Sequence, residues 1–470
     1  MPSRRLLSAA LAVVVLCGGA LPASAAPATD EVRSRVEAIP GMAFDREVKE
    51  GVPAGFRLLM VRYRQPVDHK APKGPAFDQR FQLLHRGFDR PVVAHTEGYM
   101  LTEGAYRLEP TRLLDGNQVG VEHRYFGESK PAGKLDWSKL DIWQAATDHH
   151  RLITALRGVY TGKWLTIGGS KGGMTAVYHR RFYPGDVDGT LPHVAPNDVD
   201  NGEDSAHLRF FEQVGTPQCR DRIRAFQREV LARRDELLPP LRKDADAAGH
   251  TYQRLGGLDR VYEVTIRYLE WTLWAGGSAE SDCAGGKIPA RGATTEQLHG
   301  YLRDLDVMAW CADRSEEMLL PYSYQAATQL GWASLPSAHL KGLLKYPYRG
   351  EPDHVPADIP VRFQPGVMKD IDTWVRAKGS RLLFVYGAKD PWSQEKFELG
   401  SGSRESGVFV ARDAAHQAKI AALTPAEQQR ITALLRKWTG LPATRSAGER
   451  TDVIPGFDRA VPVPDRPFPR

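Results

Sequence analysis

A chain of 470 residues is long enough to form one large core domain that carries a substantial insertion. Lys and Arg outnumber Asp and Glu by 63 to 57, which gives a formal charge of +6 and is mild for this length. No basic run is interleaved with aromatic residues, and no Cys or His cluster has the spacing of a metal site, so we expect no nucleic-acid partner, no metal and no organic cofactor.

The N-terminus has the features of a secretory signal peptide. Arg4 and Arg5 precede the apolar run Leu6–Leu16, and Ala23-Ser24-Ala25 matches the small-residue cleavage site. We predict that residues 1–25 are removed on export, and the two arginines leave both the general secretory and the twin-arginine route open. No later apolar run is long enough to span a bilayer, so we expect a secreted, extracellular protein with no stable membrane association.

Residues 26–196 have the pattern of the first part of an α/β core. Apolar runs typical of strands alternate with an amphipathic helix, Ile142–Arg157. Such alternation is typical of a mostly parallel sheet with helices on both faces. The first two strands are expected to form a hairpin around the loop Pro66–Pro75. The expected strands are Arg57–Val61, Gln79–His85, Pro91–His95, Gln118–His123, Lys163–Ile167 and Thr190–Ala195.

A serine motif follows the strand that ends at Ile167. Gly168-Gly169-Ser170-Lys171-Gly172 lies between that strand and the helical pattern from Met174, which is the strand, sharp turn and helix of a nucleophile elbow. Glycines two residues on either side of Ser170 let the chain turn tightly and let a substrate carbonyl approach. A chain with 44 glycines can produce this match by chance, and a plain strand-to-helix loop is then the alternative. Ser170 is our candidate nucleophile.

The strand pattern disappears in residues 197–350. Long amphipathic runs replace it at Cys219–Leu238, Leu258–Trp274 and Thr295–Cys311. They predict a helical cap domain over the carboxyl ends of the strands. Most aromatic residues of this segment are expected to pack between helices, and a few to face the substrate.

Three cysteines remain once the signal peptide, with Cys17, is removed. Cys219, Cys283 and Cys311 all lie in the predicted cap. They can form one disulfide and leave one thiol, and all three pairings are compatible with the sequence. In an exported chain we expect them to be structural.

Residues 351–440 return to the core pattern. The buried-strand run Arg381–Gly387 ends just before Asp390, and a second apolar run, Gly407–Val410, leads to His416. The last helix is expected at about Pro425–Trp438. Residues 441–470 are polar and rich in proline, so we predict an extended or loosely attached C-terminal tail.

The order Ser170, Asp390, His416 is the chain order of the catalytic triad in the α/β-hydrolase fold. We therefore predict this fold, with the large helical cap inserted between nucleophile and acid. In this arrangement His416 takes the proton of Ser170, while Asp390 holds the imidazole and stabilises its charged form. Asp413 is the competing acid, but it precedes the histidine by three residues and would have to fold back from the same loop.

A serine nucleophile also requires hydrogen-bond donors for the oxyanion of the tetrahedral intermediate. In this fold one donor is the amide after the nucleophile, here the N–H of Lys171, and the other comes from the loop after an early strand. That loop is Thr96–Tyr99, and Gly98 or Tyr99 is the expected second donor. The Lys171 side chain suggests a Ser-Lys dyad as an alternative, but a residue next to the nucleophile generally points away from it.

Several motifs beyond the triad are informative when taken together. They are Gln65–His69, Phe77–Phe81, Glu122–Ser129, Gly168–Gly173, Tyr183–Pro184, Val187–Gly189 and Tyr324–Gly331. Over most of residues 56–420 the chain resembles the clan of prolyl peptidases that includes lysosomal prolyl carboxypeptidase. In overall look it is most similar to secreted bacterial prolyl tripeptidyl and tetrapeptidyl aminopeptidases. The resemblance implies an exported serine enzyme that removes short peptides from free N-termini, with proline before the scissile bond.

An aminopeptidase must bind the ammonium group of its substrate, which in a partly desolvated pocket calls for a carboxylate. The candidates are Glu97, beside the predicted oxyanion loop, and Glu203 with Asp204, at the entry to the cap. A hydrogen-bonded structural or surface acid is the alternative for each. We interpret the charged block Glu122–Tyr125 as a buried salt-bridge network, with lining of the pocket as the alternative.

The sequence thus predicts an exported serine exopeptidase that acts through an acyl-enzyme on peptides with free N-termini. The same fold and triad also serve ester cleavage, so a secreted esterase or lipase is the alternative enzyme. A lid rich in Met and Leu would favour that alternative, whereas this cap is rich in Arg, Glu and Asp. An inactive adhesive or wall-binding protein that keeps the fold is the alternative from another class. No feature of the sequence indicates an oligomeric state.

Overall fold

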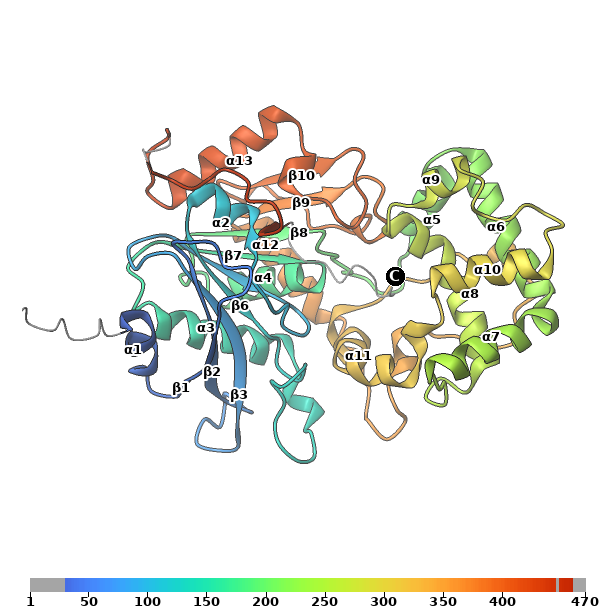
Figure 1. The fold of residues 1–470 in the computed structure, drawn as a ribbon, viewed down its shortest axis with the longest axis horizontal. Coiled ribbons are helices and arrows are strands. Elements are labelled where there is room, and N and C mark those ends of the chain that lie inside the picture. The colour runs from blue at the N-terminus through green and yellow to red at the C-terminus, as the bar shows by residue number, and fades with distance from the viewer. Residues whose placement is uncertain (1–29, 445–447, 460–470) are drawn as a thin grey trace, which may run out of the picture.

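A nine-stranded sheet forms the centre of the core in the computed structural model, which describes residues 30–444 and 448–459 (Figure 1). Its strands are Met42–Val48 (β1), Arg57–Pro66 (β2), Ala76–His85 (β3), Val92–Thr96 (β4), Asn117–Val121 (β6), Trp164–Gly169 (β7), Gly189–His193 (β8), Leu383–Gly387 (β9) and Gly407–Ala411 (β10). The order across the sheet is β1-β2-β3-β6-β4-β7-β8-β9-β10. The pairs from β1 to β6 are antiparallel, and those from β6 to β10 are parallel.

Helices cover both faces of this sheet, because its parallel strands are apolar on both sides. Successive side chains of a strand point to opposite faces. Leu383 and Val385 of β9 therefore join the apolar cluster under α2 and α13, whereas Phe384 and Tyr386 join the cluster under α3, α4 and α12. The core helices are Glu31–Glu37 (α1), Glu109–Leu114 (α2), Ile142–Leu156 (α3), Lys171–Phe182 (α4), Gly366–Lys378 (α12) and Pro425–Trp438 (α13). The sheet order and its helical layers are those of an α/β-hydrolase.

The first helix and the first strand, α1 and β1, were not expected from the sequence. β1 is an edge strand whose side chains are mostly half-buried or exposed, so its sequence lacks a clear alternation of apolar residues. It is held by its neighbour β2, where Arg57 forms ion pairs with Glu47 of β1 and with Asp30. The predicted signal peptide, residues 1–25, lies outside the described residues. Within them, no helix has both the length and the apolar character needed to cross a bilayer.

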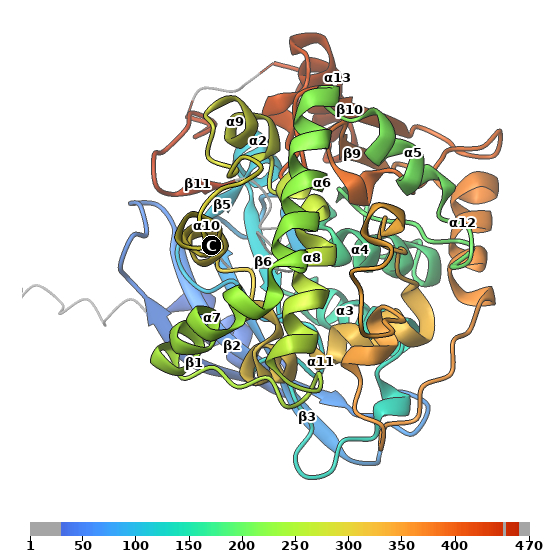
Figure 2. The same ribbon diagram turned by 90° about the vertical axis from the view of Figure 1, so that its right-hand side faces the viewer.

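The segment after β8 folds into a group of helices that lies in front of the sheet in Figure 2. These helices are Ser205–Gln213 (α5), Pro217–Ala232 (α6), Arg234–Ala248 (α7), Leu258–Ala275 (α8), Ala279–Ala284 (α9), Thr295–Leu305 (α10) and Asp313–Gln325 (α11). They have an apolar cluster of their own, whose buried members run from Phe210 to Leu340. Trp271 and Trp274 of α8 are only 1% exposed within it. This separate core makes the segment a helical cap.

The helix expected at Cys219–Leu238 is in fact two helices. α6 ends at Ala232 and α7 begins at Arg234, because Arg233 leaves the helical conformation at φ −100° and ψ 26°. The change of direction lets α6 pack on α8 and α9 while α7 packs on α10. Arg233 itself is held by ion pairs to Glu229 and Glu236. Apolar periodicity continued through this bend, so it gave no signal of the break.

The expectation of a loosely attached tail is wrong for residues 448–459. Asp458–Arg459 (β11) pairs in parallel with Arg107–Leu108 (β5), and Phe457 is 2% exposed. The guanidinium of Arg107, which is fully buried, donates to both carboxylate oxygens of Asp458. A buried arginine requires such a partner, and this ion pair therefore ties the segment to the core. Residues 445–447 and 460–470 of the predicted tail lie outside the described residues.

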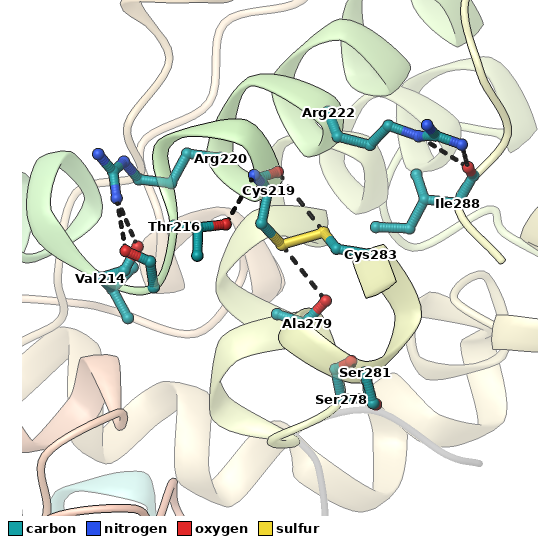
Figure 3. The surroundings of a disulfide bond; sticks show 11 residues. Val214, Thr216, Cys219, Arg220, Arg222, Ser278, Ala279, Ser281, Cys283 and Ile288 are labelled. Carbon is teal, nitrogen blue, oxygen red and sulfur yellow. Dashed lines mark hydrogen bonds between the residues drawn. A yellow bond between two sulfur atoms is a disulfide. The ribbon is translucent and has the colours of Figure 1, made fainter. Parts of the chain in front are cut away.

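The disulfide left open by the sequence joins Cys219 of α6 to Cys283 of α9 (Figure 3). The two Cα atoms lie 5.5 Å apart, and the bridge closes a loop of 64 residues. Cys311 is a free, buried thiol. The N-terminus of α6 is further fixed by Thr216, whose hydroxyl accepts a hydrogen bond from the N–H of Cys219.

Replacement of both bridged cysteines by serine is expected to lower the free energy of unfolding of the cap by about 2–4 kcal/mol, because the bridge restricts the unfolded chain. Thermal or urea unfolding, followed by tryptophan fluorescence, measures the loss. A reducing agent should cause the same loss in the unmodified protein and none in the double variant. If reduction leaves the stability of the unmodified protein unchanged, the bridge between Cys219 and Cys283 does not contribute to it.

Candidate active site

Three side chains that lie far apart in the sequence meet at the carboxyl ends of the parallel strands. Ser170 follows β7, Asp390 follows β9, and His416 lies in the loop after β10. The hydroxyl of Ser170 lies 3.0 Å from Nε2 of His416, and Nδ1 of His416 lies 2.8 Å from Oδ2 of Asp390. The main chain of His416 is anchored to the cap, because its N–H donates to the carbonyl of Ala275. The three groups thus form a continuous hydrogen-bonded line from hydroxyl to carboxylate.

Ser170 sits in a strained turn between β7 and α4. Its φ of 54° and ψ of −125° are unusual for a residue with a side chain, and its N–H donates to the carbonyl of His193. The glycines around it are needed for space. A Cβ atom at Gly168 would lie 2.2 Å from the carbonyl oxygen of Gly172, and one at Gly172 would lie 2.3 Å from that of Thr96. The turn therefore presents the hydroxyl at the end of the sheet, as a nucleophile elbow does.

Asp390 is fully buried, and two further groups donate to its carboxylate. They are the N–H of Trp392 and the hydroxyl of Ser393, both in the short helix that follows. These bonds fix the carboxylate toward His416. The competing acid, Asp413, has a side chain that is 87% exposed and pairs with Lys389, not with the histidine. Asp390 is therefore the acid of the constellation.

The predicted oxyanion donors lie next to one another. The N–H of Lys171 is the first of α4 and has no acceptor within the helix. Gly98, with φ 80°, packs so tightly on the start of α4 that a Cβ atom there would lie 2.5 Å from the nitrogen of Gly172. This contact brings the Gly98–Tyr99 loop beside Ser170. Burial raises the pKa of Tyr99, so the phenol keeps its proton.

The side chain of Lys171 is buried and faces the oxyanion loop. Its ammonium donates to the carbonyl of Gly98 and lies 5.4 Å and 5.1 Å from the ring centres of Tyr99 and Phe126. Burial lowers the pKa of Lys171 well below its usual value. The lysine therefore contacts the loop that carries the predicted second oxyanion donor.

A pocket opens in front of Ser170 and His416, between the core and the cap. Its walls combine core residues with aromatic side chains of the cap and of the segment that leads back to the core. Ser170, Met174 and Trp392 come from the core, and the cap side contributes Tyr268, Trp310, Tyr322 and Trp332. The ring of Trp392 packs edge-on against Trp271 of α8, with 4.7 Å between the ring centres, and lies tilted to the ring of His416 at 6.1 Å. Ser170 thus lies in a pocket that has the cap as one of its walls.

None of the three acids proposed from the sequence as ammonium ligands is a wall residue of this pocket. Glu97 is buried and satisfied internally by Thr102, Tyr106 and His95. Glu203 lies at the surface, where it accepts from the N–H of Ser205. Asp204 accepts from the N–H of Ser334. It is not a wall residue itself, but it lies 3.8 Å from His207, which is one. Four other acids line the pocket: Asp198, Glu316, Glu351 and Glu395.

Sequence reasoning missed these four acids because they come from separate elements. Asp198 follows β8, Glu316 lies in α11, Glu351 begins a short helix after the cap, and Glu395 follows Asp390 by five residues. Only Asp198 carried a usable signal, since it follows the carboxyl end of a parallel strand.

Among the described residues, Asp204, His207 and Glu395 also form a group whose ligand atoms all lie within 4.8 Å of one another, a spacing compatible with a metal ion.

Two of these acids form a compensated group with a histidine. Nδ1 of His354 lies 3.0 Å from both carboxylate oxygens of Glu316. Burial alone would lower the pKa of His354, but the charge and hydrogen bond of Glu316, with the charge of Glu351, raise it to about 9. His354 is therefore charged at neutral pH, and it neutralises part of the negative charge of this wall.

The raised pKa of His354 predicts a loss of stability at alkaline pH. Its contribution is complete below the unfolded pKa of 6.5 and disappears as the pH rises through 9. We expect the free energy of unfolding to fall by about 1 to 3 kcal/mol between these values for this reason. In the His354→Gln protein this part of the decline should be missing, and Glu316→Gln should remove most of it as well. Urea unfolding at several pH values measures the decline in the free energy of unfolding. Equal declines in the unmodified protein and in both variants would contradict the prediction.

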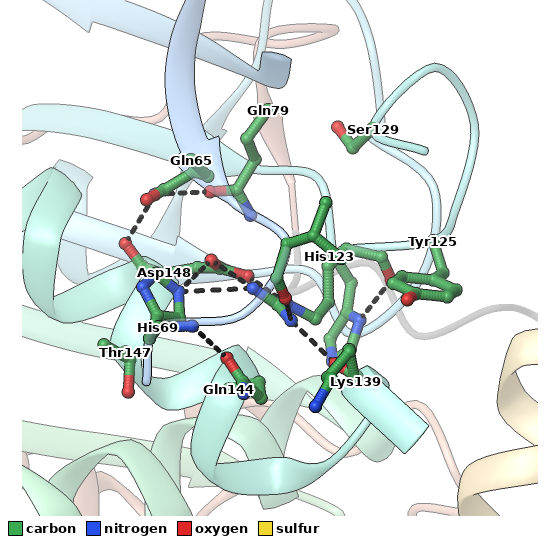
Figure 4. Close-up of polar contacts among 12 residues, drawn as sticks. Gln65, His69, Gln79, His123, Tyr125, Ser129, Lys139, Gln144, Thr147 and Asp148 are labelled. Carbon is green, nitrogen blue, oxygen red and sulfur yellow. Dashed lines mark hydrogen bonds and ion pairs between the residues drawn. The ribbon is translucent and has the colours of Figure 1, made fainter. Parts of the chain in front are cut away.

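The charged block at Glu122–Tyr125 forms a buried network away from the pocket walls (Figure 4). Arg124 donates to both carboxylate oxygens of Asp148, which also lies 2.7 Å from Nε2 of His69. The same guanidinium donates to the carbonyls of Val67 and Lys139. The network joins the β2–β3 loop, the loop after β6 and helix α3, as expected of a buried salt-bridge network.

Comparison with known proteins finds relatives of this chain. The chain is 45% identical over 444 residues to the prolyl tri/tetrapeptidyl aminopeptidase of Streptomyces mobaraensis, covering 93% of this chain and 92% of that protein. It is 28% identical to the serine protease vicPb of Bipolaris victoriae, over 47% of this chain and 46% of that protein. It is also 28% identical to the lysosomal Pro-X carboxypeptidase of Mus musculus, over 37% and 35% of the two chains.

A family model covers nearly the whole chain. Residues 25–457 match the family described as PS-10 peptidase S37. The matched segment contains the core strands, the cap and all three residues of the hydrogen-bonded line from Ser170 to Asp390. The chain therefore belongs to the PS-10 peptidase S37 family and is a serine peptidase with the α/β-hydrolase fold.

Proposed function

We propose that this peptidase is an exported aminopeptidase that releases short peptides, of three or four residues, from free N-termini and prefers proline before the scissile bond. The observation that carries the proposal is the line Ser170–His416–Asp390 at the floor of a pocket that the cap covers. A covered pocket favours chain ends over folded protein segments. The 45% identity to the Streptomyces aminopeptidase supports the size of the released peptide and the proline preference.

The first chemical step is attack of the Ser170 hydroxyl on the carbonyl carbon of the scissile bond. Nε2 of His416 takes the hydroxyl proton, while Nδ1–H donates to Asp390 and the carboxylate stabilises the imidazolium. The oxyanion that forms accepts hydrogen bonds from the N–H of Lys171 and from the Gly98–Tyr99 loop. His416 then gives its proton to the leaving amine, and the carbonyl stays on Ser170 as an ester.

Hydrolysis of this acyl-enzyme repeats the same proton transfers with water. Water enters the place of the departed amine and loses a proton to Nε2 of His416 as it attacks the ester carbonyl. Collapse of the second tetrahedral intermediate returns the proton to Ser170 and releases the short peptide as a carboxylate. The chain's own residues carry every proton transfer of this cycle.

Export is part of the proposal. The signal features of residues 1–25 and the disulfide Cys219–Cys283 both favour an oxidising compartment outside the cytoplasm. Detection of the mature protein in the culture medium, with an N-terminus near Ala26, tests this part separately from the activity.

Mass spectrometry of products from a peptide set tests the activity. Each sequence is offered with a free and with an acetylated N-terminus, and with proline or alanine at the third and fourth positions. We expect tri- or tetrapeptides that end in proline, from the free series and much less from the acetylated one. Internal fragments would contradict an exopeptidase, and faster cleavage of acyl esters than of any peptide would favour an esterase.

A further inference from the structure

The acids of the pocket form two groups, which differ in how much of their negative charge is neutralised by nearby basic side chains. Glu316 and Glu351 share the charged imidazole of His354, so this group holds a cation of its own. Asp198 and Glu395 belong to the second group, together with Asp204 next to the wall. Its single basic member is His207, whose Nδ1 lies 3.3 Å from Glu395 and 3.8 Å from Asp204. Three carboxylates thus face one imidazole.

No lysine or arginine forms an ion pair with these three carboxylates in the part of the chain that the structure describes. Asp198 is the least satisfied of them. The residue is 8% exposed and lines the pocket, and its Oδ1 has no hydrogen-bond partner among the described residues. A carboxylate in this position is costly unless a cation that donates hydrogen bonds lies beside it. Burial, followed by repulsion from Glu395 and Asp204, accordingly raises the pKa of Asp198 to about 8.

The main chain around Asp198 holds this unpaired group in place. Gly331, with φ 80°, lies so close that a Cβ atom there would be 2.3 Å from Oδ2 of Asp198. No other residue type fits at this position without moving the acid. The N–H of Trp332, next along the chain, donates to Oδ1 of Asn201, three residues after Asp198. One oxygen is therefore fixed against the Gly331–Trp332 segment, while the other stays unpaired at the pocket wall.

We propose that Asp198 binds the ammonium group of the substrate's N-terminus, with Glu395 and Asp204 adding negative charge beside it. This inference rests on the proposed aminopeptidase function and names the residue behind its requirement for a free amine. An ammonium group has three N–H donors and one positive charge, so its binding beside the unpaired oxygen favours the charged form of Asp198 over the protonated one. His207 and Glu395 then set the position of the second carboxylate.

Kinetics on one peptide with a free and with an acetylated N-terminus tests the inference. We expect Asp198→Asn to raise KM for the free peptide by about 10- to 100-fold, the effect of one lost charged hydrogen bond, and to change kcat little. The acetylated peptide should be cleaved by this variant as poorly as by the unmodified enzyme. Glu395→Gln should act in the same direction with a smaller effect. Glu203→Gln, at a surface acid that is outside the pocket, is the matched control and should change neither substrate.

The outcomes separate this inference from the proposed function. If the unmodified enzyme cleaves both peptides equally, it is not an aminopeptidase, and both proposals fail. If the enzyme prefers the free peptide and Asp198→Asn keeps the full preference, only the role of Asp198 is overturned. An equal loss of cleavage rate on the free and the acetylated peptide would also overturn it, because Asp198 would then support the fold or the catalytic step and not the binding of the amine. Should Asp198→Asn not fold, the same comparison is decided with Glu395→Gln.

Treatment with a chelator tests whether a divalent metal ion, and not the substrate ammonium, binds to this group of acids. Removal of divalent ions with EDTA should leave the preference for free N-termini unchanged. A preference that is lost with EDTA and restored by Zn²⁺ would show that Asp204, His207 and Glu395 hold a metal ion, and would overturn the ammonium site.

Discussion

Replacement of Ser170 by alanine is expected to lower kcat by at least about 10⁴-fold and to leave KM for the same peptide nearly unchanged. The hydroxyl is the nucleophile of the proposed reaction, and no other hydroxyl is hydrogen-bonded to His416 among the described residues. The oxyanion donors and the pocket walls remain in the variant, so the residual rate comes from them alone. Steady-state kinetics on a proline-containing peptide measures both constants.

Labelling with a fluorophosphonate checks that this loss is chemical and not structural. The reagent should modify Ser170 in the native protein and leave the Ser170→Ala protein unlabelled, while both unfold at similar temperatures. Alanine carries a Cβ as serine does, so the variant keeps the strain of the φ of 54° and its stability should stay close to that of the native protein. Full labelling of the alanine variant would point to a different nucleophile, and an unlabelled native protein would favour an inactive scaffold.

The parts of the site that follow a strand could be predicted from the sequence. Ser170, Asp390 and His416 each come shortly after an apolar run, and in a parallel sheet the carboxyl ends of such runs lie at one edge. The glycines around Ser170 added a local signal, because close approach to the backbone of α4 excludes larger residues there. The order serine, acid, histidine along the chain is that of the α/β-hydrolase triad, so these three residues were enough to predict the fold class.

The walls of the pocket could not be predicted in this way. Glu351 and Asp198 are brought together by the packing of the cap on the core, and no periodicity in their own segments marks them. Glu97 illustrates the converse error. It stands beside the predicted oxyanion loop in the sequence, yet its carboxylate turns inward to Tyr106 and Thr102. The direction of a side chain depends on partners that are distant in the chain, which local patterns do not contain.

Replacement of Asp390 by asparagine is expected to lower kcat by about 10⁴-fold at neutral pH. An asparagine amide keeps the shape of the side chain, but it removes the charge that stabilises the imidazolium of His416 and favours the wrong tautomer of the ring. The N–H of Trp392 donates to one carboxylate oxygen and the hydroxyl of Ser393 to the other, so the asparagine oxygen keeps one of these bonds and the fold should persist. The measurement is kcat as a function of pH, and the rate should recover partly at high pH.

Asp413→Asn is the matched control for this prediction, because Asp413 is the other acid near His416 in the sequence. Its carboxylate is 87% exposed and lies 3.7 Å from the amine of Lys389, so its loss removes only a weak surface ion pair. We expect kcat of this variant to stay within about twofold of the unmodified enzyme. A large loss in Asp413→Asn with little change in Asp390→Asn would mean that the loop after β10 rearranges in the working enzyme. It would then be Asp413 that orients His416.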